Sequence, residues 1–269
     1  MAVLKISGLS KSFGIKTVFE NVSFEVRSGE RIGLVGANGA GKTTLLKCIM
    51  GAEEVDKGSV KASDGAIIGY LRQGFNYTSH TIREEMEDAW KDVLYYKDRM
   101  ETLARELESS KSDEKLVEAY GRAEARFEFL GGYDYESTTR KILTGLGFSD
   151  DDWDRDIHSF SGGQKVRINL AAAFVRHPDF LLLDEPTNHL DMGMLEWLEE
   201  YLRSYKGGIL MISHDRYFLD GAATGIIDLE NHHIRSFRGG YTRYMETKEN
   251  QDRAYEKAYE KQQEHIKET

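Results

Sequence analysis

The sequence predicts a mixed α/β fold with a long helical insertion, and three patterns support this prediction. Short apolar runs of the kind that are buried in parallel sheets occur at 180–183, 209–212 and 226–229. A glycine-rich segment, 36–44, connects another apolar run to a helical pattern. Apolar residues at near-helical spacing fill the stretch from 81 to about 130. The chain of 269 residues is long enough for one large or two modest domains.

The composition is that of a folded protein with a well-buried core. Apolar residues make up 40% and charged residues 30% of the chain, which argues against disorder and against a membrane protein. We find no apolar run near the roughly 18 residues that a membrane span requires, and the N-terminus begins as a strand instead of a signal peptide. The lone Cys48 is expected to be a small buried hydrophobe, and the net charge of -10 argues against a module that coats polyanions. These features predict a cytoplasmic protein.

The elements are predicted in three groups. The first is a set of short strands around the glycine-rich segment, at 3–7, 22–26, 31–35 and 67–71. The second is helical: Thr81 and Glu84 have capping-box spacing, a polar break follows at 109–113, and Ser112 is a candidate N-cap for the next helix. The third returns to alternating strands and helices from 180 to 237, and after Tyr244 the chain becomes charged and helical.

The most specific motif is the segment 36–44, called here the phosphate loop. A strand that turns through glycines into a helix directs backbone N–H groups and the positive end of the helix dipole at one point, where phosphate oxygens bind. In the pattern G-x-x-x-x-G-K-T, Lys42 reaches the β- and γ-phosphates and Thr43 offers its hydroxyl to Mg²⁺. The motif therefore predicts binding of a nucleoside triphosphate. The candidate contacts are Gly36, Asn38, Gly39, Ala40, Gly41, Lys42, Thr43 and Thr44.

Two acids follow the apolar run 181–183, at the strand end where open α/β sheets bind their ligands. Asp184 is placed to hold Mg²⁺ through its water shell, and Glu185 to accept a proton from the water that attacks the γ-phosphate. An arbitrary Asp-Glu pair more often begins a solvated loop, but the upstream phosphate loop favours the catalytic interpretation. His214, after the next apolar run, is a candidate γ-phosphate contact, although a lone histidine there is more often a polar loop residue.

A second anion-binding pattern precedes the helical stretch that begins at 165. Two adjacent glycines there predict a helix N-terminus bare of side chains. With the phosphate loop and the two acids, this segment resembles the signature motif of ATP-binding-cassette (ABC) ATPases, and the resemblance covers 3–244. It implies a P-loop NTPase cassette with an antiparallel β subdomain and a helical subdomain or arm, which binds ATP and Mg²⁺. The signature residues are Ser161, Gly162, Gly163 and Gln164.

The resemblance also implies a catalytic arrangement and further site residues. In this family the signature of one cassette closes over ATP held by the phosphate loop of another, so full ATPase activity needs a second cassette. Gln73 matches the Q-loop glutamine that contacts Mg²⁺ and water, and Phe13 the aromatic ring that stacks on adenine. Asp191 matches the D-loop, and His214 the switch histidine. Alone, Phe13 could equally pack in a strand core and Gln73 could be a surface residue; their spacing from the stronger motifs favours the functional interpretation.

Three further runs resemble the ABC-F subfamily, whose members carry no membrane domain and act on ribosomes. They are E-P-T-N-H-L-D at 185–191, S-H-D-R-Y-F-L-D at 213–220 and F-R-G-G-Y-T-R-Y at 237–244, where Gly240 replaces the usual asparagine. The helical stretch from 81 fits the arm that such proteins carry in the first cassette. The ribosome, with its rRNA or bound tRNA, is the implied partner.

Two departures limit the resemblance. ABC-F proteins usually contain two cassettes joined by a long helical linker, whereas this chain has one phosphate loop and one signature. We therefore expect a first cassette at 1–245, with its helical subdomain at about 78–150, followed by the start of a linker at 246–269. The second departure is charge: acids and bases nearly balance from 251 onward, so this segment does not predict an electrostatic grip on RNA.

Three functional classes stay open at this stage. The favoured one is an ATP-driven protein of the ribosome, either a translation factor or a ribosome-protection protein that confers antibiotic resistance. The alternative is the ATPase subunit of a membrane transporter, against which the run 185–191 and the pair Tyr241 and Tyr244 argue. A third is a docking module that binds ATP without hydrolysing it.

Overall fold

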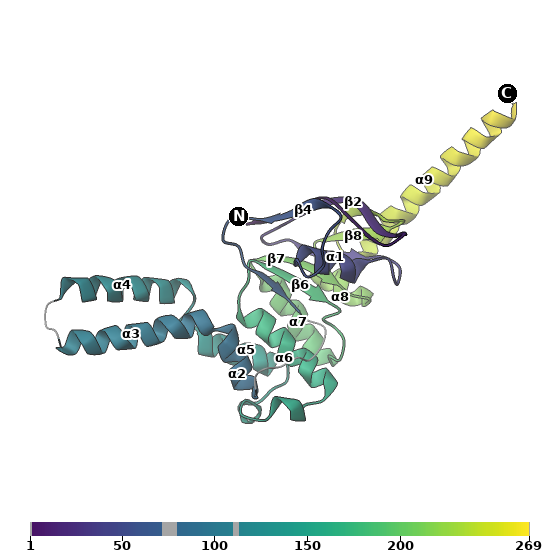
Figure 1. The fold of residues 1–269 in the computed structure, drawn as a ribbon. Helices are drawn as coiled ribbons and strands as arrows, with labels where there is room; N and C mark the ends of the chain where they lie inside the picture. The colour runs from purple at the N-terminus through teal and green to yellow at the C-terminus, as the bar shows by residue number, and fades with distance from the viewer. Residues whose placement is uncertain (1, 72–79, 110–112, 269) are drawn as a thin grey trace. The chain divides into compact units, whose positions relative to one another are not determined.

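The computed structural model describes residues 2–71, 80–109 and 113–268, with side-chain surroundings up to residue 254. Close packing divides the chain into two compact units, which are described separately (Figure 1). The first consists of 1–71, 178–188 and 198–269, and the second of 72–177 and 189–197. The second unit therefore extends beyond the predicted helical subdomain at about 78–150.

An antiparallel sheet of three strands opens the first unit. Its order is β2-β1-β4, with β1 at Val3–Phe13, β2 at Lys16–Arg27 and β4 at Lys57–Ala62. Both β1 and β2 are longer than the predicted strands 3–7 and 22–26. Register shifts after Ile6 and after Leu9 interrupt the alternation of apolar and polar residues, so periodicity captured only one end of each strand.

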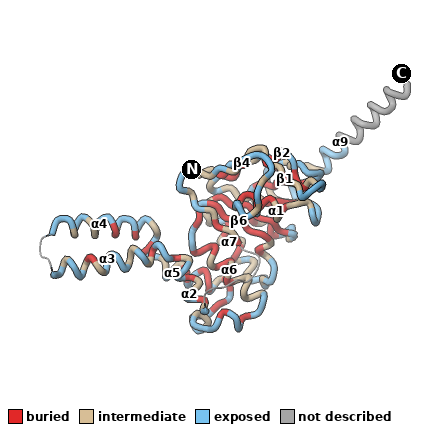
Figure 2. Tube along the Cα trace, viewed as in Figure 1, coloured by how far each residue is buried: buried red, intermediate tan, exposed pale blue. Residues whose placement is uncertain are grey.

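A second sheet of six strands confirms the predicted α/β fold. Its order is β5-β6-β7-β3-β8-β9, and every neighbouring pair is parallel except β8 with β9. All residues of β6 and β7 are buried, as Figure 2 shows for β6. The strands are β3 (Arg31–Val35), β5 (Ile68–Tyr70), β6 (Phe180–Asp184), β7 (Gly208–Ile212), β8 (Gly225–Glu230) and β9 (His233–Arg238).

One hydrophobic core joins both sheets of the first unit to helix α1 (Lys42–Ile49). Leu45 and Leu46 of α1 are fully buried in it, with Phe19 from the antiparallel sheet and Leu182 from the six-stranded sheet. Cys48 is 4% exposed in the same core, so its predicted burial is confirmed. The core fixes α1, and with it the phosphate loop that precedes α1, against β3.

The strand order places three predicted functional segments at one edge of the six-stranded sheet. The phosphate loop follows β3, the two acids lie at the end of β6, and His214 follows β7. Adjacent β6 and β7 are parallel and in register, with Asp184 opposite Ile212. Because the carboxyl ends of parallel strands lie at one edge, the chain brings these segments together there.

The second unit is helical. Thr81 caps α2 by accepting the Glu84 N–H, as predicted, but the Glu84 carboxylate accepts the N–H of His80 instead of the Thr81 N–H. The predicted cap Ser112 lies outside the described residues, and Asp113 caps α4 by accepting the Lys115 N–H. The helices are α2 (Ile82–Ala89), α3 (Lys91–Ser109), α4 (Glu114–Phe129), α5 (Tyr135–Gly145), α6 (Gly162–Val175) and two single 3-10 turns, Asp150–Asp152 and Ile157–Ser159.

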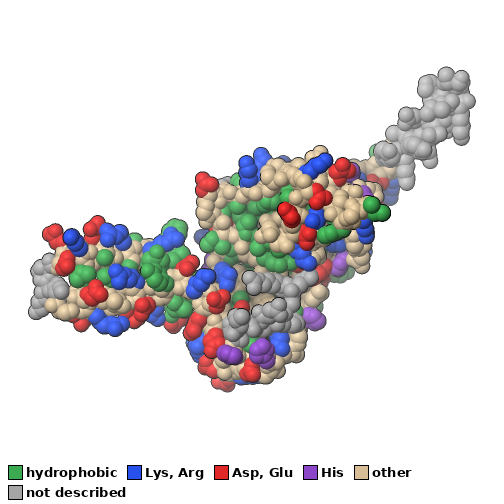
Figure 3. Space-filling view, viewed as in Figure 1, with side chains coloured by type: hydrophobic (Ala, Val, Ile, Leu, Met, Phe, Trp, Pro, Cys, Tyr) green, Lys and Arg blue, Asp and Glu red, His purple; other side chains and the backbone are tan. Residues whose placement is uncertain are grey.

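Helices α3 and α4 form a hairpin within the second unit (Figure 1). The face of the hairpin visible in Figure 3 carries Lys and Arg side chains interspersed with Asp and Glu. This face is not a uniformly basic stripe of the kind that binds RNA through its phosphates.

Three further helices complete the chain: α7 (Met192–Ser204), which spans the boundary between the two units, α8 (Arg216–Ala222) and α9 (Tyr241–Glu268). Helix α9 begins five residues before the predicted linker boundary at 246. No helix in the described part of the chain combines the length and apolar character that a membrane crossing requires.

A buried carboxylate anchors α9 to the sheet. Asp228 of β8 is 1% exposed and accepts hydrogen bonds from the Tyr244 hydroxyl at 2.8 Å and from Lys248 Nζ at 2.7 Å. Burial, together with the hydrogen bond to Asp228, raises the pKa of Tyr244 to about 12. Burial alone would lower the pKa of Lys248, but its hydrogen bonds to Asp228 and Glu230 raise it above the usual range.

These shifts predict a loss of stability in alkali. Both groups bind their proton more tightly in the folded chain than in the unfolded chain. Their stabilisation is therefore complete below the unfolded pKa values of about 10 and is lost as the pH rises toward 12. In urea unfolding between pH 9 and 12, the Tyr244→Phe and Lys248→Met variants should each lose less stability than the parent chain. An identical alkaline loss in parent and variants would contradict this assignment.

Candidate nucleotide site

The phosphate loop joins β3 to α1 in the way the sequence predicts. Asn38 and Gly39 are exposed, so the outer side of the loop is open to a ligand. Gly41, at φ 104°, is the N-cap of α1, and its lack of a side chain leaves the first N–H groups of the helix without a side-chain cap. An uncapped helix N-terminus favours anions through its N–H groups and the helix dipole.

Lys42 lies inside this loop. It is 8% exposed, and its ammonium donates to the carbonyl oxygens of Gly36 at 2.9 Å and Ala37 at 3.0 Å. An ammonium has three N–H donors, so the two loop carbonyls leave one for a ligand oxygen. Burial lowers the pKa of Lys42, while the nearby charges of Glu185 and Asp184 oppose that effect. The loop thus holds a cation close to both acids.

Two loop glycines are required by close packing. A Cβ on Gly36, at φ 150°, would collide with the carbonyl oxygen of Leu229, and a Cβ on Gly41 would collide with the Val18 side chain. Gly39, at φ 78°, has nothing within 4 Å of the position a Cβ would take. The loop is therefore packed against the protein at its two ends and open in the middle, which is the form of a cradle.

Asp184 and Thr43 form the second part of the site. Asp184, the last residue of β6, is 4% exposed. Burial raises the pKa of Asp184, while a hydrogen bond from the Thr43 hydroxyl and the positive charge of Lys42 act in the opposite direction. A carboxylate and a hydroxyl in contact are hard oxygen donors, the ligand type that Mg²⁺ prefers. Within the described residues, no three His, Cys, Asp or Glu side chains form a metal cluster, so these two oxygens would have to be supplemented by water and phosphate.

Glu185 and His214 form the third part. The Glu185 carboxylate accepts the backbone N–H of His214 at 3.3 Å, and His214 Nε2 lies 3.3 Å from Glu185 Oε1. Glu185 has a φ of 52°, a left-handed conformation that costs a non-glycine residue about 1–3 kcal/mol. Its N–H bond to the Ile212 carbonyl, at 2.9 Å, holds this conformation. The His214 side chain is 60% exposed, whereas the Glu185 side chain is 18% exposed and its Oε1 is buried.

Two other residues predicted to contact the nucleotide or its Mg²⁺ are Phe13 and Gln73. Phe13 ends β1 and is 51% exposed, with the Lys11 ammonium 4.9 Å from the ring centroid. The alternative that Phe13 packs in a strand core is therefore wrong, and its free face can take a stacking partner. Gln73 lies outside the described residues.

The signature segment belongs to the second unit. Ser161 is the N-cap of α6, where its hydroxyl accepts the Gln164 N–H at 3.3 Å and the Gln164 amide oxygen accepts the Ser161 N–H at 2.9 Å. The prediction of an N-terminus bare of side chains is therefore wrong, because S-x-x-Q is a capping box. Ser161 and Gly162 are exposed, and a Cβ on Gly163 would lie 3.0 Å from the His189 Cβ. Asp191 accepts the Met194 N–H at 2.9 Å and so caps α7.

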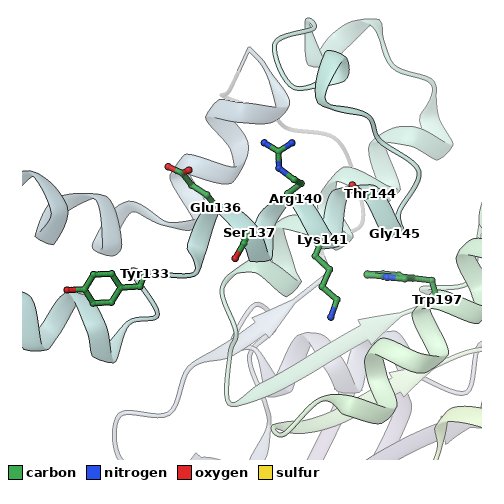
Figure 4. A pocket seen from close by; sticks show the side chains of 8 residues that line it. All are labelled: Tyr133, Glu136, Ser137, Arg140, Lys141, Thr144, Gly145 and Trp197. Atoms are coloured by element: carbon green, nitrogen blue, oxygen red, sulfur yellow. The ribbon is translucent and has the colours of Figure 1, made fainter.

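A separate surface pocket of about 720 Å³ lies in the second unit (Figure 4). It is lined mainly by α5, from which Lys141 projects beside Trp197 of α7, and the indole packs directly on Gly145. None of the predicted site residues lines this pocket. We therefore place the nucleotide site at the sheet edge and not in this pocket.

Two family models, both described as ABC transporter, match the chain at residues 19–188 and 227–269. The first model alone spans more than half of the chain and contains the phosphate loop, the signature segment and both acids. The chain therefore belongs to the ABC transporter family of ATPases.

Individual relatives align with 88–99% of the chain. It is 40% identical over 99% of its length to YdiF of Bacillus subtilis, named as an ATP-binding protein, and 38% identical over 99% to ABC transporter F family member 5 of Arabidopsis thaliana. It is also 34% identical over 88% of its length to the energy-dependent translational throttle protein EttA of Mycobacterium tuberculosis. The chain spans 42%, 39% and 42% of the lengths of these relatives.

The fold is shared with solved structures. The ATP-binding subunit of an ABC transporter superposes with a TM-score of 0.67 at 24% identity, covering 88% of this chain and 90% of that subunit. At this identity the likeness supports the cassette fold alone.

The packing of the phosphate loop predicts unequal effects of two alanine substitutions. Gly36→Ala forces a Cβ against the Leu229 carbonyl, whereas Gly39→Ala adds a Cβ in open space, and both carry the penalty of a positive φ. Gly36→Ala should therefore destabilise the chain by about 1–3 kcal/mol more than Gly39→Ala, the usual range for overpacking. Urea unfolding of both variants measures the difference. Equal losses would mean that the loop is not packed against β8.

Proposed function

We propose that this chain is an ATP-binding and ATP-hydrolysing cassette of an ABC-F type protein that acts on the ribosome in the cytoplasm. The observation that carries the ATPase part is the sheet edge where Lys42, Asp184 and Glu185 interact electrostatically and His214 contacts Glu185. Lys42 supplies a cation for the phosphates, and Asp184 supplies a hard oxygen donor. Glu185 supplies the base, and His214 is the neighbour of that base. Lys42 comes after β3, Asp184 and Glu185 lie at the end of β6, and His214 comes after β7.

In this proposal the chain binds ATP mainly by its triphosphate. The N–H groups of the phosphate loop and the N-terminus of α1 receive the phosphate oxygens, and Lys42 neutralises charge between the β- and γ-phosphates. Phe13 stacks on the adenine ring. Thr43, Asp184 and Gln73 would hold Mg²⁺, which supplies charge neutralisation at the phosphates when it is bound.

Hydrolysis is assigned to Glu185 and His214. Water attacks the γ-phosphorus, the bond to the ADP oxygen breaks, and Glu185 accepts the proton that the water loses. The His214 N–H orients the Glu185 carboxylate, and the neighbouring imidazole would contact the γ-phosphate. Residues 161–164 and Asp191 serve the nucleotide of a second cassette, supplied by a longer chain or by another copy.

The ribosomal part of the proposal is supported by the sequence runs 185–191 and 237–244 and by the names of two relatives, an F family member and a translational throttle protein. The second candidate, an ATPase subunit that couples to a membrane protein, is favoured by the description of the family model and by the structurally similar transporter subunit. The choice between a translation factor and a ribosome-protection protein stays open within the proposal.

Lys42→Ala should abolish nucleotide binding, because the phosphates lose the cation inside the loop. At 100 times the dissociation constant, ligand binding stabilises a protein by about 2.7 kcal/mol, which a thermal-shift assay with Mg-ATP detects. Lys61→Ala, an exposed lysine of β4, is the control and should keep the full shift. A full shift in Lys42→Ala would place the nucleotide elsewhere. Parallel titrations with GTP measure the base preference.

Glu185→Gln should leave Mg-ATP binding intact and slow hydrolysis by about 10²- to 10⁴-fold, the usual contribution of a positioned base. The assay measures phosphate release by the whole protein that contains this chain, with Glu200→Gln, an exposed acid of α7, as control. Unchanged turnover would remove Glu185 from the mechanism. The same slow variant, held in its ATP state, should co-sediment with ribosomes in a sucrose gradient. Co-purification with a membrane protein, and no ribosome binding, would favour the transporter alternative.

A further inference from the structure

The strand β8 contacts both the phosphate loop and the C-terminal helix α9. In the parallel pairing of β3 with β8, Asp228 lies opposite Val35, the last residue before the phosphate loop. The next residue, Leu229, places its carbonyl oxygen directly against Gly36. The carboxylate that anchors α9 is therefore one residue away from the backbone that closes the phosphate loop.

The Asp228 side chain makes its described contacts with α9. It is 1% exposed and accepts from Tyr244 in the first turn and from Lys248 one turn later, both on Oδ2. Lys248 also lies 3.1 Å from Glu230, and Arg235 bridges Glu230 and Asp252 along the exposed side of the same helix. Tyr244, Lys248 and Asp252 thus tie about two and a half turns of α9 to the β8–β9 hairpin through hydrogen bonds and ion pairs.

A second carboxylate ties α9 to the segment after His214. Asp220 of α8 accepts the Thr242 N–H at 2.7 Å and also the Thr242 hydroxyl. Gly240 fits here because a Cβ would lie 2.6 Å from Asp220 Oδ1. The Arg216 guanidinium, two residues after His214, lies 5.6 Å from the Tyr241 ring centroid. The start of α9 therefore contacts β8, which pairs with the strand before the phosphate loop, and α8, which follows His214.

A buried ion pair of this kind is weak evidence for a purely stabilising role. Well-packed apolar residues of similar volume are often as stable, and buried charges fix one arrangement among several. Since an apolar contact between α9 and β8 would also give stability, the charged arrangement is suited to fixing one orientation of α9 on the strand that closes the phosphate loop.

We propose that Asp228 is a positioning residue that couples α9 to the phosphate loop, so that nucleotide binding orders the first turns of α9. This inference rests on the proposed nucleotide binding at residues 36–44. It makes the order of the first turns of α9 depend on the nucleotide. Asp220 supports the same coupling from the side of His214.

Hydrogen–deuterium exchange with and without Mg-ATP tests the coupling. In the parent chain, nucleotide should slow amide exchange both at 36–45 and at 241–254, by about fivefold or more, the lower end of couplings between sites. In Asp228→Asn, which keeps the side-chain shape, the slowing at 36–45 should stay and the slowing at 241–254 should be lost. Lys248 keeps its contact with Glu230 in this variant, so no charge is left unpaired. Arg253→Gln, which breaks only the contact with Glu249 within α9, is the matched control and should behave like the parent.

The outcomes separate the two proposals. No slowing at 36–45 in the parent would contradict nucleotide binding itself. Slowing at 36–45 without slowing at 241–254 in the parent, or equal slowing at 241–254 in Asp228→Asn, would overturn the coupling while nucleotide binding stands. If Asp228 only stabilised the packing of α9, Asp228→Asn would speed amide exchange in α9 equally with and without nucleotide. If Asp228→Asn fails to fold, Tyr244→Phe and Lys248→Met replace it in the test. Each removes one donor to Asp228 and should reduce the nucleotide-dependent slowing at 241–254.

Discussion

The site depends on the position of one cation, the Lys42 ammonium held by two carbonyl oxygens of its own loop. A lysine side chain is flexible and strongly hydrated, so a free lysine samples many conformations before it binds a phosphate. Here the carbonyls of Gly36 and Ala37 hold the ammonium in place. That arrangement needs the loop backbone to stay fixed, and the loop is fixed because Gly36 packs on Leu229 and the α1 core packs between two sheets. The charge of the site is therefore positioned by the hydrophobic core.

The sequence predicted which residues lie at this edge better than it predicted the ends of the strands. The strand that precedes the phosphate loop was predicted at its observed ends, 31–35, because its residues after Arg31 are continuously apolar, and 33–35 are buried. Strands β1 and β2 were predicted too short, since bulges break their alternation, and the mostly polar β4 was not predicted at all. The position of Glu185 beside His214 follows from the adjacency of β6 and β7. Strand order depends on tertiary pairing, which no local pattern encodes.

Other features were missed although the sequence contained a signal. The run 226–229 was interpreted as fully apolar, yet it includes Asp228, and a lone acid inside a buried strand requires partners. Those partners, Tyr244 and Lys248, lie a helical turn apart on α9, a spacing that could have indicated one contacting face. Ser161 and Gln164 were likewise interpreted only as an anion site. Their spacing is that of a capping box, which the structure contains.

The self-capped end of α6 has a consequence for assembly with a second cassette. With the Ser161 hydroxyl already on the Gln164 N–H, an incoming phosphate must compete with a neutral acceptor that is part of the same chain. A charged acceptor forms hydrogen bonds roughly twice as strong as a neutral one, so only an anion gains from the exchange. The Ser161 hydroxyl therefore caps α6 within the chain, and a phosphate bound at this helix end would have to replace that hydrogen bond.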